Sequence, residues 1–88
     1  MLVSEIEIVN RLGLHARTAA KFVQTAGRFP CEIEVSRGEK KINGKSIMGV
    51  MMLAAAQGAV IKISVYGAEE EAALDALLKL VADGFGEN

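Results

Sequence analysis

The spacing of apolar and polar positions divides the chain into four strands and three helices. Apolar residues recur with the period of two that is typical of strands at 2–9, 32–36, 40–42 and 60–66. They recur at helical spacing at 16–26, 46–56 and 69–83. The predicted order is therefore β-α-β-β-α-β-α, with the second and third strands forming a hairpin around Gly38.

Each of these elements has one apolar face and one polar face. In the strands, the predicted inward positions are Leu2, Ser4, Ile6 and Ile8 in the first strand and Ile61, Ile63 and Val65 in the last strand. In the helices they are Ala19, Phe22, Val23 and Ala26 in the first helix and Ala73, Leu74, Leu77, Leu78 and Val81 in the last helix. The strands carry polar residues on the opposite face, namely Glu5, Glu7, Glu32, Glu34, Lys62 and Ser64. This pattern predicts an α+β fold, in which a four-stranded antiparallel sheet has three helices on one face and solvent on the other.

Length and charge exclude several classes of protein. The 88 residues predict a single domain over 1–88, and a net charge of −1 without basic runs argues against nucleic acid as a partner. No apolar stretch is long enough to cross a bilayer, and the N-terminus lacks the layout of a signal peptide. Cys31 stands alone, which fits a reducing cytoplasm, and one histidine with one cysteine is too few ligands for a metal site. We expect no cofactor.

The strongest chemical signal is His15, the one histidine of the chain. It lies where the first loop meets the predicted helix 16–26, two residues before Arg17. A helix N-terminus offers free N–H groups and the positive end of the helix dipole, and both bind anions. Both features, together with the cation, also favour a neutral imidazole, which is the nucleophilic form. His15 is therefore a candidate acceptor of a phosphoryl group.

Two motifs at a fixed separation carry a resemblance to a known family. They are Asn10-Arg11-Leu12-Gly13-Leu14-His15-Ala16-Arg17 and Asn43-Gly44-Lys45-Ser46-Ile47-Met48-Gly49. Together they resemble the histidine-containing phosphocarrier protein (HPr) of the bacterial phosphotransferase system, and the likeness covers essentially the whole chain. It implies an open-faced β-sandwich and no enzymatic turnover of small molecules.

The resemblance also implies partners and roles. In that family Enzyme I, phosphorylated by phosphoenolpyruvate, passes the group to Nδ1 of the histidine, and EIIA domains of sugar permeases or regulatory systems receive it. By position, His15 is the acceptor and Arg17 assists the phosphate. Ser46 corresponds to the target of the HPr kinase/phosphorylase, and from the residues alone it is a helix N-cap.

The chain departs from the family at Thr18, where proline is usual. Proline stiffens the start of a helix, whereas threonine offers an N–H and a hydroxyl instead. We therefore expect the first turn, with Ala16 and Thr18, to help hold a phosphate.

The short helix after Ser46 is too apolar to be buried on every side. We predict that Ile47, Met48 and Met51 lie exposed near His15 and form a docking patch, since methionine adapts to different partners. Lys21, Gln24 and Lys45 are expected around that patch. We expect a monomer that binds its partners transiently.

Two other functions fit the sequence. One is the nitrogen-related branch of the same family, which phosphorylates regulatory proteins; the ending Asp83-Gly84-Phe85-Gly86 and the Asn-Arg-Leu-Gly motif favour it slightly. The other is a small interaction domain with an incidental histidine. Labelling with Enzyme I and phosphoenolpyruvate separates the carriers from the interaction domain.

Overall fold

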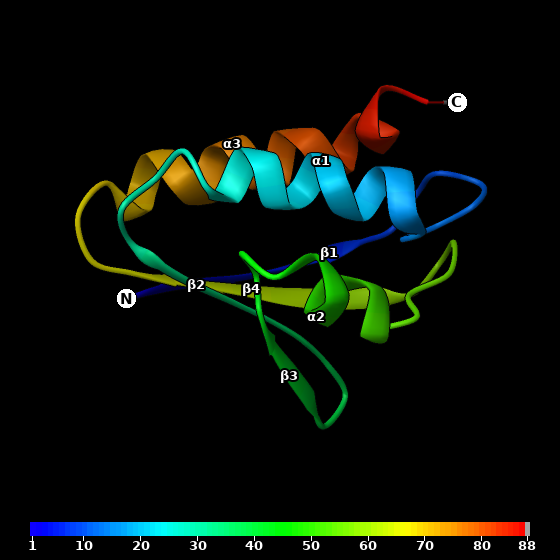
Figure 1. The fold of residues 1–88 in the computed structure, drawn as a ribbon, viewed down its shortest axis with the longest axis horizontal. Coiled ribbons are helices and arrows are strands. Elements are labelled where there is room, and N and C mark those ends of the chain that lie inside the picture. Colours follow the sequence, from blue (N-terminus) through cyan, green and yellow to red (C-terminus); the bar gives the residue numbers. More distant parts are fainter. Residues whose placement is uncertain (88) are drawn as a thin grey trace.

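The computed structural model describes residues 1–87 and contains the predicted elements in the predicted order (Figure 1). These elements are β1 (Leu2–Glu7), α1 (Ala16–Ala26), β2 (Glu32–Arg37), β3 (Lys40–Asn43), α2 (Ile47–Met52), β4 (Val60–Tyr66), α3 (Glu70–Ala82) and a 3₁₀ turn, η1 (Gly84–Gly86). The bounds of α1 and β4 agree with the sequence prediction residue for residue. The first strand ends earlier than predicted, at Glu7, although Ile8 beyond it is fully buried.

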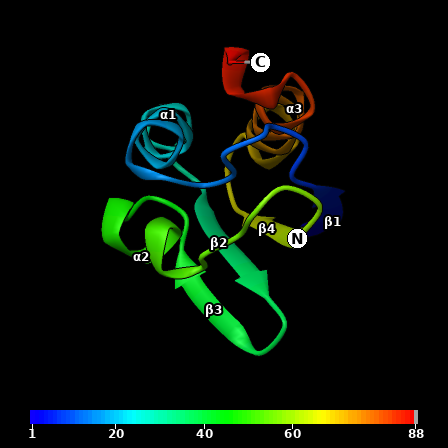
Figure 2. The same ribbon diagram turned by 90° about the vertical axis from the view of Figure 1, so that its right-hand side faces the viewer.

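The four strands form one antiparallel sheet in the order β1-β4-β2-β3. Ile6 lies opposite Ile61, and Val35 lies opposite Ile63, so that apolar side chains of neighbouring strands share one face. The three helices lie on that face (Figures 1 and 2). The predicted α+β architecture is confirmed.

The core fills the space between the sheet and the helices. Its largest fully buried side chains include Phe22 of α1, Ile61 of β4 and Leu77 of α3. The predicted polar face is exposed at its glutamates and at Lys62, whereas Ser64 is half-buried. Burying a side chain the size of leucine stabilises the fold by about 1.5–3 kcal/mol, so this single apolar layer holds the helices in place.

The helix α2 is shorter than predicted, because it ends at Met52 rather than near Ala56. Ala54 adopts a left-handed backbone with φ of 51°, which no helix continues through. Cationic side chains of the β2–β3 hairpin satisfy the last carbonyl groups: Arg37 donates to the oxygens of Leu53 and Ala54, and Lys40 donates to the oxygen of Met52. The spacing of apolar residues alone did not predict that the helix ends at Met52.

The chain continues past α3 into η1, which the pattern did not predict. Three successive residues, Gly84, Phe85 and Gly86, have positive φ values of 64°, 59° and 74°. The backbone therefore turns after α3, and Lys21 of α1 reaches this turn through a hydrogen bond to the carbonyl oxygen of Phe85. The Phe85 side chain is 1% exposed and anchors this turn in the core.

Candidate functional site

The structure places His15 at the N-cap of α1, as expected. Its backbone is extended, with φ −119° and ψ −173°, and its side chain is 32% exposed. The backbone N–H of Arg17 donates a hydrogen bond to His15 Nδ1 at 3.3 Å. The ring thus caps the helix with a nitrogen, a role that serine or aspartate oxygens usually fill.

Thr18 completes this cap from the opposite direction. Its Oγ1 accepts the N–H of His15 at 3.0 Å and donates to the carbonyl oxygen of Gly13 at 2.9 Å. The side chain is fully buried. The hydroxyl therefore faces inward and fixes the loop before the helix, whereas the expected help with a phosphate from the first turn stays a prediction.

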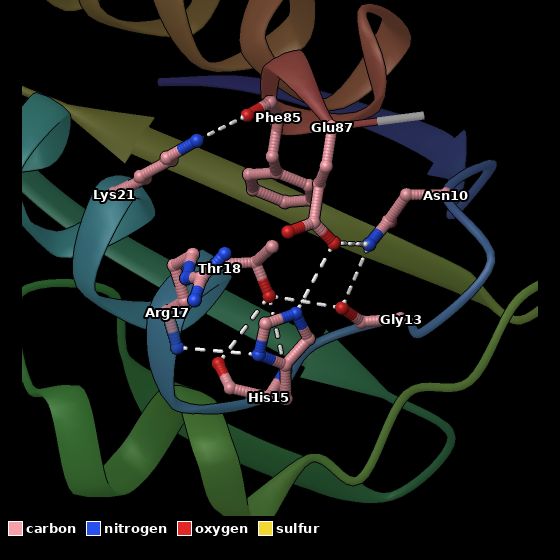
Figure 3. Close-up of polar contacts among 8 residues, drawn as sticks. All are labelled: Asn10, Gly13, His15, Arg17, Thr18, Lys21, Phe85 and Glu87. Atoms are coloured by element: carbon pink, nitrogen blue, oxygen red, sulfur yellow. Dashed lines mark hydrogen bonds and ion pairs between the residues drawn. The ribbon is translucent and has the colours of Figure 1, made fainter.

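Glu87 lies beside the imidazole on the side away from the helix, and the sequence analysis missed it (Figure 3). Its Oε1 is 3.1 Å from His15 Nε2 and accepts a hydrogen bond from Asn10 Nδ2, also at 3.1 Å. The hydrogen bond from the His15 ring lowers the pKa of the Glu87 carboxyl, against partial desolvation. The Asn10 amide, the charge of His15 when its ring is protonated and the charge of Lys21 lower this pKa further. Glu87 is therefore ionised at neutral pH.

The two contacts of the ring fit one of its two neutral tautomers. Nδ1 faces an N–H donor and so carries a lone pair, whereas Nε2 faces a carboxylate and so carries the hydrogen. In that tautomer the lone pair of Nδ1 is available as a nucleophile. Nδ1 also lies at the positive end of α1, where an incoming anion is stabilised.

The last residues are held against the site by two further contacts. Lys21 Nζ donates to the carbonyl oxygen of Phe85 at 2.7 Å, and the Phe85 ring is buried (Figure 3). A phenylalanine between two glycines, just beyond an amphipathic helix, was the available signal that the chain turns back here. Nothing in the local pattern indicated that Glu87 would reach His15, 72 residues earlier in the chain.

The loop before His15 is held by hydrogen bonds inside the molecule. Gly13 has φ of 68°, and its carbonyl oxygen accepts hydrogen bonds from both Asn10 and Thr18. Asn10 is 4% exposed and uses its amide nitrogen twice, toward Gly13 and Glu87. The opposite amide orientation would turn its oxygen toward two other oxygens, which explains why the buried Oδ1 is left without a hydrogen-bond partner among residues 1–87.

The remaining predicted site residues lie around α1 and α2, which are neighbours in Figure 2. Ala16, Arg17 and Gln24 are exposed. The ammonium group of Lys21 is held by Phe85 as described, and that of Lys45 donates to the carbonyl oxygen of Phe29 at 2.6 Å. These two lysines therefore hold backbone segments together, a role that the sequence did not predict.

The second motif places Ser46 at the N-cap of α2, where its Oγ accepts the N–H of Gly49 at 3.1 Å. Ile47, Met48 and Met51 are exposed by 41%, 68% and 40%, which confirms their predicted exposure. We call these three residues the docking patch. Residues 1–87 hold no group of three or more potential metal ligands, and none of their helices could cross a membrane.

Comparison with known proteins agrees with this geometry. The family model described as "PTS HPr component phosphorylation site" matches residues 3–83. The phosphocarrier protein HPr of Neisseria meningitidis is 53% identical over 87 residues, covering 99% of this chain and 98% of the relative.

Two solved structures from Thermoanaerobacter tengcongensis are also similar. HPr-C-His has a TM-score of 0.96 and 51% identity, covering 100% of this chain and 99% of the other. An HPr dimer has a TM-score of 0.79 and 54% identity, covering 93% and 94%. With its fold, its helix-capping histidine and these similarities, the chain belongs to the HPr family of phosphocarrier proteins of the phosphotransferase system.

Proposed function

We propose that this carrier accepts a phosphoryl group on Nδ1 of His15 from phosphorylated Enzyme I and passes it to EIIA domains. The observation that carries the proposal is the pair of contacts of the ring: Nδ1 faces the Arg17 N–H at the N-terminus of α1, and Nε2 faces the Glu87 carboxylate. We also propose that the protein is cytoplasmic and acts as a monomer of one domain, since it holds a free, buried Cys31 and its site is complete within one chain.

In the proposed reaction the Nδ1 lone pair forms the new bond to phosphorus. The bond from phosphorus to the donor atom of Enzyme I breaks, and its electron pair leaves with the donor. The Arg17 N–H then loses Nδ1 as an acceptor and becomes free to donate to a phosphoryl oxygen. Its exposed guanidinium and the first turn at Ala16 add positive potential, which is how proteins mainly assist phosphoryl transfer.

Incubation with Enzyme I and labelled phosphoenolpyruvate tests the proposal. The protein should acquire label that acid removes and base does not. Failure to acquire label would reject the carrier function. Running the assay with a sugar-branch and a nitrogen-branch Enzyme I identifies the branch, because only the cognate enzyme should label the protein at a high rate.

Arg17→Ala should slow phosphoryl transfer about tenfold to a hundredfold, because it removes a cation beside the developing charge. Its exposed side chain contributes little to folding, so the free energy of unfolding should change by less than about 0.5 kcal/mol. Initial transfer rates and denaturant unfolding measure the two effects. The control is Arg28→Ala, an exposed arginine just beyond the other end of α1, which should transfer like wild type. Equal rates in the two variants would contradict the role of Arg17.

We propose that the docking patch, ringed by Lys21, Gln24 and Lys45, receives Enzyme I and EIIA in turn. Support comes from its exposed apolar side chains on α2, next to the helix that carries His15. Phosphorylation of Ser46 by an HPr kinase/phosphorylase would add about two negative charges beside this patch. Because anions suit a helix N-terminus, the modification would alter association rather than folding.

Ser46→Asp should therefore bind Enzyme I about fivefold more weakly, with a larger loss at low salt, because the added charge repels an acidic partner surface. Aspartate also caps helices well, so the stability should stay within about 0.5 kcal/mol of wild type. Titration calorimetry and thermal unfolding measure these quantities. Ser46→Asn, an uncharged cap, is the control and should bind normally. Wild-type affinity in the aspartate variant would contradict regulation at this residue.

A further inference from the structure

We propose that Glu87 is a positioning residue for phosphoryl transfer: its carboxylate keeps a proton on Nε2 of His15 before, during and after the reaction. The inference rests on the proposed function and assigns a role to a residue outside both sequence motifs. Glu87 contacts the ring at 3.1 Å but not the reacting nitrogen.

The first step of the argument concerns which nitrogen can react. A neutral imidazole has one proton, and attack through Nδ1 requires that proton to be on Nε2. A carboxylate can only accept a hydrogen bond, so Glu87 stabilises the Nε2–H form and disfavours the form in which Nε2 is bare. The Arg17 N–H donates to Nδ1 and so favours the same form, in which Nδ1 carries no hydrogen. Each nitrogen therefore faces the group that the reactive form requires.

The second step concerns charge during transfer. When Nδ1 bonds to phosphorus, the ring keeps the Nε2 proton and becomes positively charged. Its Nε2–H can still donate to the Glu87 oxygen in that state. When the group leaves for the next acceptor, the electron pair of the N–P bond returns to Nδ1. The ring is then neutral, with its proton already on Nε2. No proton has to enter or leave the ring in either direction, which suits a reversible carrier.

The third step is that the structure holds Glu87 in this position. The same oxygen, Oε1, accepts from both His15 and Asn10, so the buried amide of Asn10 orients the carboxylate. Lys21 fixes the backbone at Phe85, two residues earlier, and the Phe85 ring is buried. The Glu87 side chain itself is 23% exposed, so that water competes only partly for it.

The test compares Glu87→Ala with Glu87→Gln, using the full chain. Glutamine keeps an oxygen that can accept from both His15 and Asn10 but has no charge. Glu71→Ala, an exposed glutamate on α3, is the control for the loss of one negative charge. Because the chain has one histidine, the imidazole ¹⁵N signals belong to His15 without assignment. The ¹⁵N chemical shifts at a pH where the ring is neutral report which nitrogen carries the proton.

We expect wild type, Glu87→Gln and Glu71→Ala to show the Nε2–H form. Glu87→Ala should shift toward the Nδ1–H form. The maximal rate of transfer from phosphorylated Enzyme I should fall about tenfold in Glu87→Ala, as when other outer partners of a reactive histidine are lost. It should stay within about threefold of wild type in Glu87→Gln, and the KM for the carrier should not change.

Two results would overturn the inference. One is an alanine variant whose ¹⁵N shifts and maximal rate match wild type. The other is an equal fall in rate for the alanine and glutamine variants, because charge rather than proton placement would then be responsible. Failure of the proposed function is a separate outcome, since wild type itself would acquire no label. The ¹⁵N comparison needs no partner and would still decide the position of the proton.

Discussion

His15→Ala is expected to abolish labelling of the protein by Enzyme I and phosphoenolpyruvate. The chain has no second imidazole, and Nδ1 of His15 is the nucleophile that we propose. Transfer should fall below detection, a loss of more than about a thousandfold, because an unactivated side chain cannot replace a reacting nitrogen. Acid treatment of gel-separated protein, with and without base treatment in parallel, measures the label and its chemical type.

The same substitution removes a helix cap, so a control must separate chemistry from stability. Loss of the cap should cost about 1 kcal/mol of the free energy of unfolding. His15→Asn supplies an oxygen acceptor at the N-cap and should recover most of that stability, but it should acquire no label either. Acid-labile label in the asparagine variant would contradict His15 as the acceptor. Label that is acid-stable and base-labile would instead indicate a hydroxyl such as that of Ser46.

Gly13→Ala is expected to be the most destabilising small substitution near the site. A Cβ at Gly13 would collide with the carbonyl oxygen of Ala55, which already accepts the N–H of Leu14 at 2.8 Å. The positive φ of 68° adds about 1–2 kcal/mol for any residue with a Cβ, and the collision with backbone adds about 1–3 kcal/mol. The free energy of unfolding should therefore fall by about 3 kcal/mol or more.

Gly38→Ala is the matched control, because it introduces the same atom at nearly the same backbone angle. Gly38 has φ of 59°, and no heavy atom lies within 4 Å of the added Cβ. It should lose only about 1 kcal/mol, the cost of the left-handed conformation. Chemical denaturation of the two variants measures the difference. Equal losses would show that the contact between the loop and Ala55 does not constrain Gly13.

The core faces of the elements followed from the sequence because burial imposes a period. The alternation in Val60–Tyr66 and the spacing of Ala19, Phe22 and Ala26 report solvent exposure directly, and the structure agrees with both. The pattern did not predict where α2 ends, because that end depends on hydrogen bonds from Arg37 and Lys40 of the β2–β3 hairpin. Contacts between residues far apart in the chain produce no periodic pattern in the sequence.

For the candidate site, too, local features could be predicted and contacts between distant residues could not. The position of His15 at a helix start is a local property, and so is the cap at Ser46. The direction of the Thr18 hydroxyl and the approach of Glu87 depend on how the loop and the last turn pack. A pattern of residue types predicts that a site exists, whereas the partner of each nitrogen is a property of the folded chain.

The contacts that end α2 connect the β2–β3 hairpin to the helix that carries the docking patch. Arg37 and Lys40 lie outside the docking patch, yet they bind the carbonyl groups on which the last turn of its helix depends. Neutralising either cation should loosen that turn and change how Met48 and Met51 are presented, without altering a residue of the docking patch. Sequence change in the hairpin can thus reshape the docking patch from a distance while leaving His15 untouched.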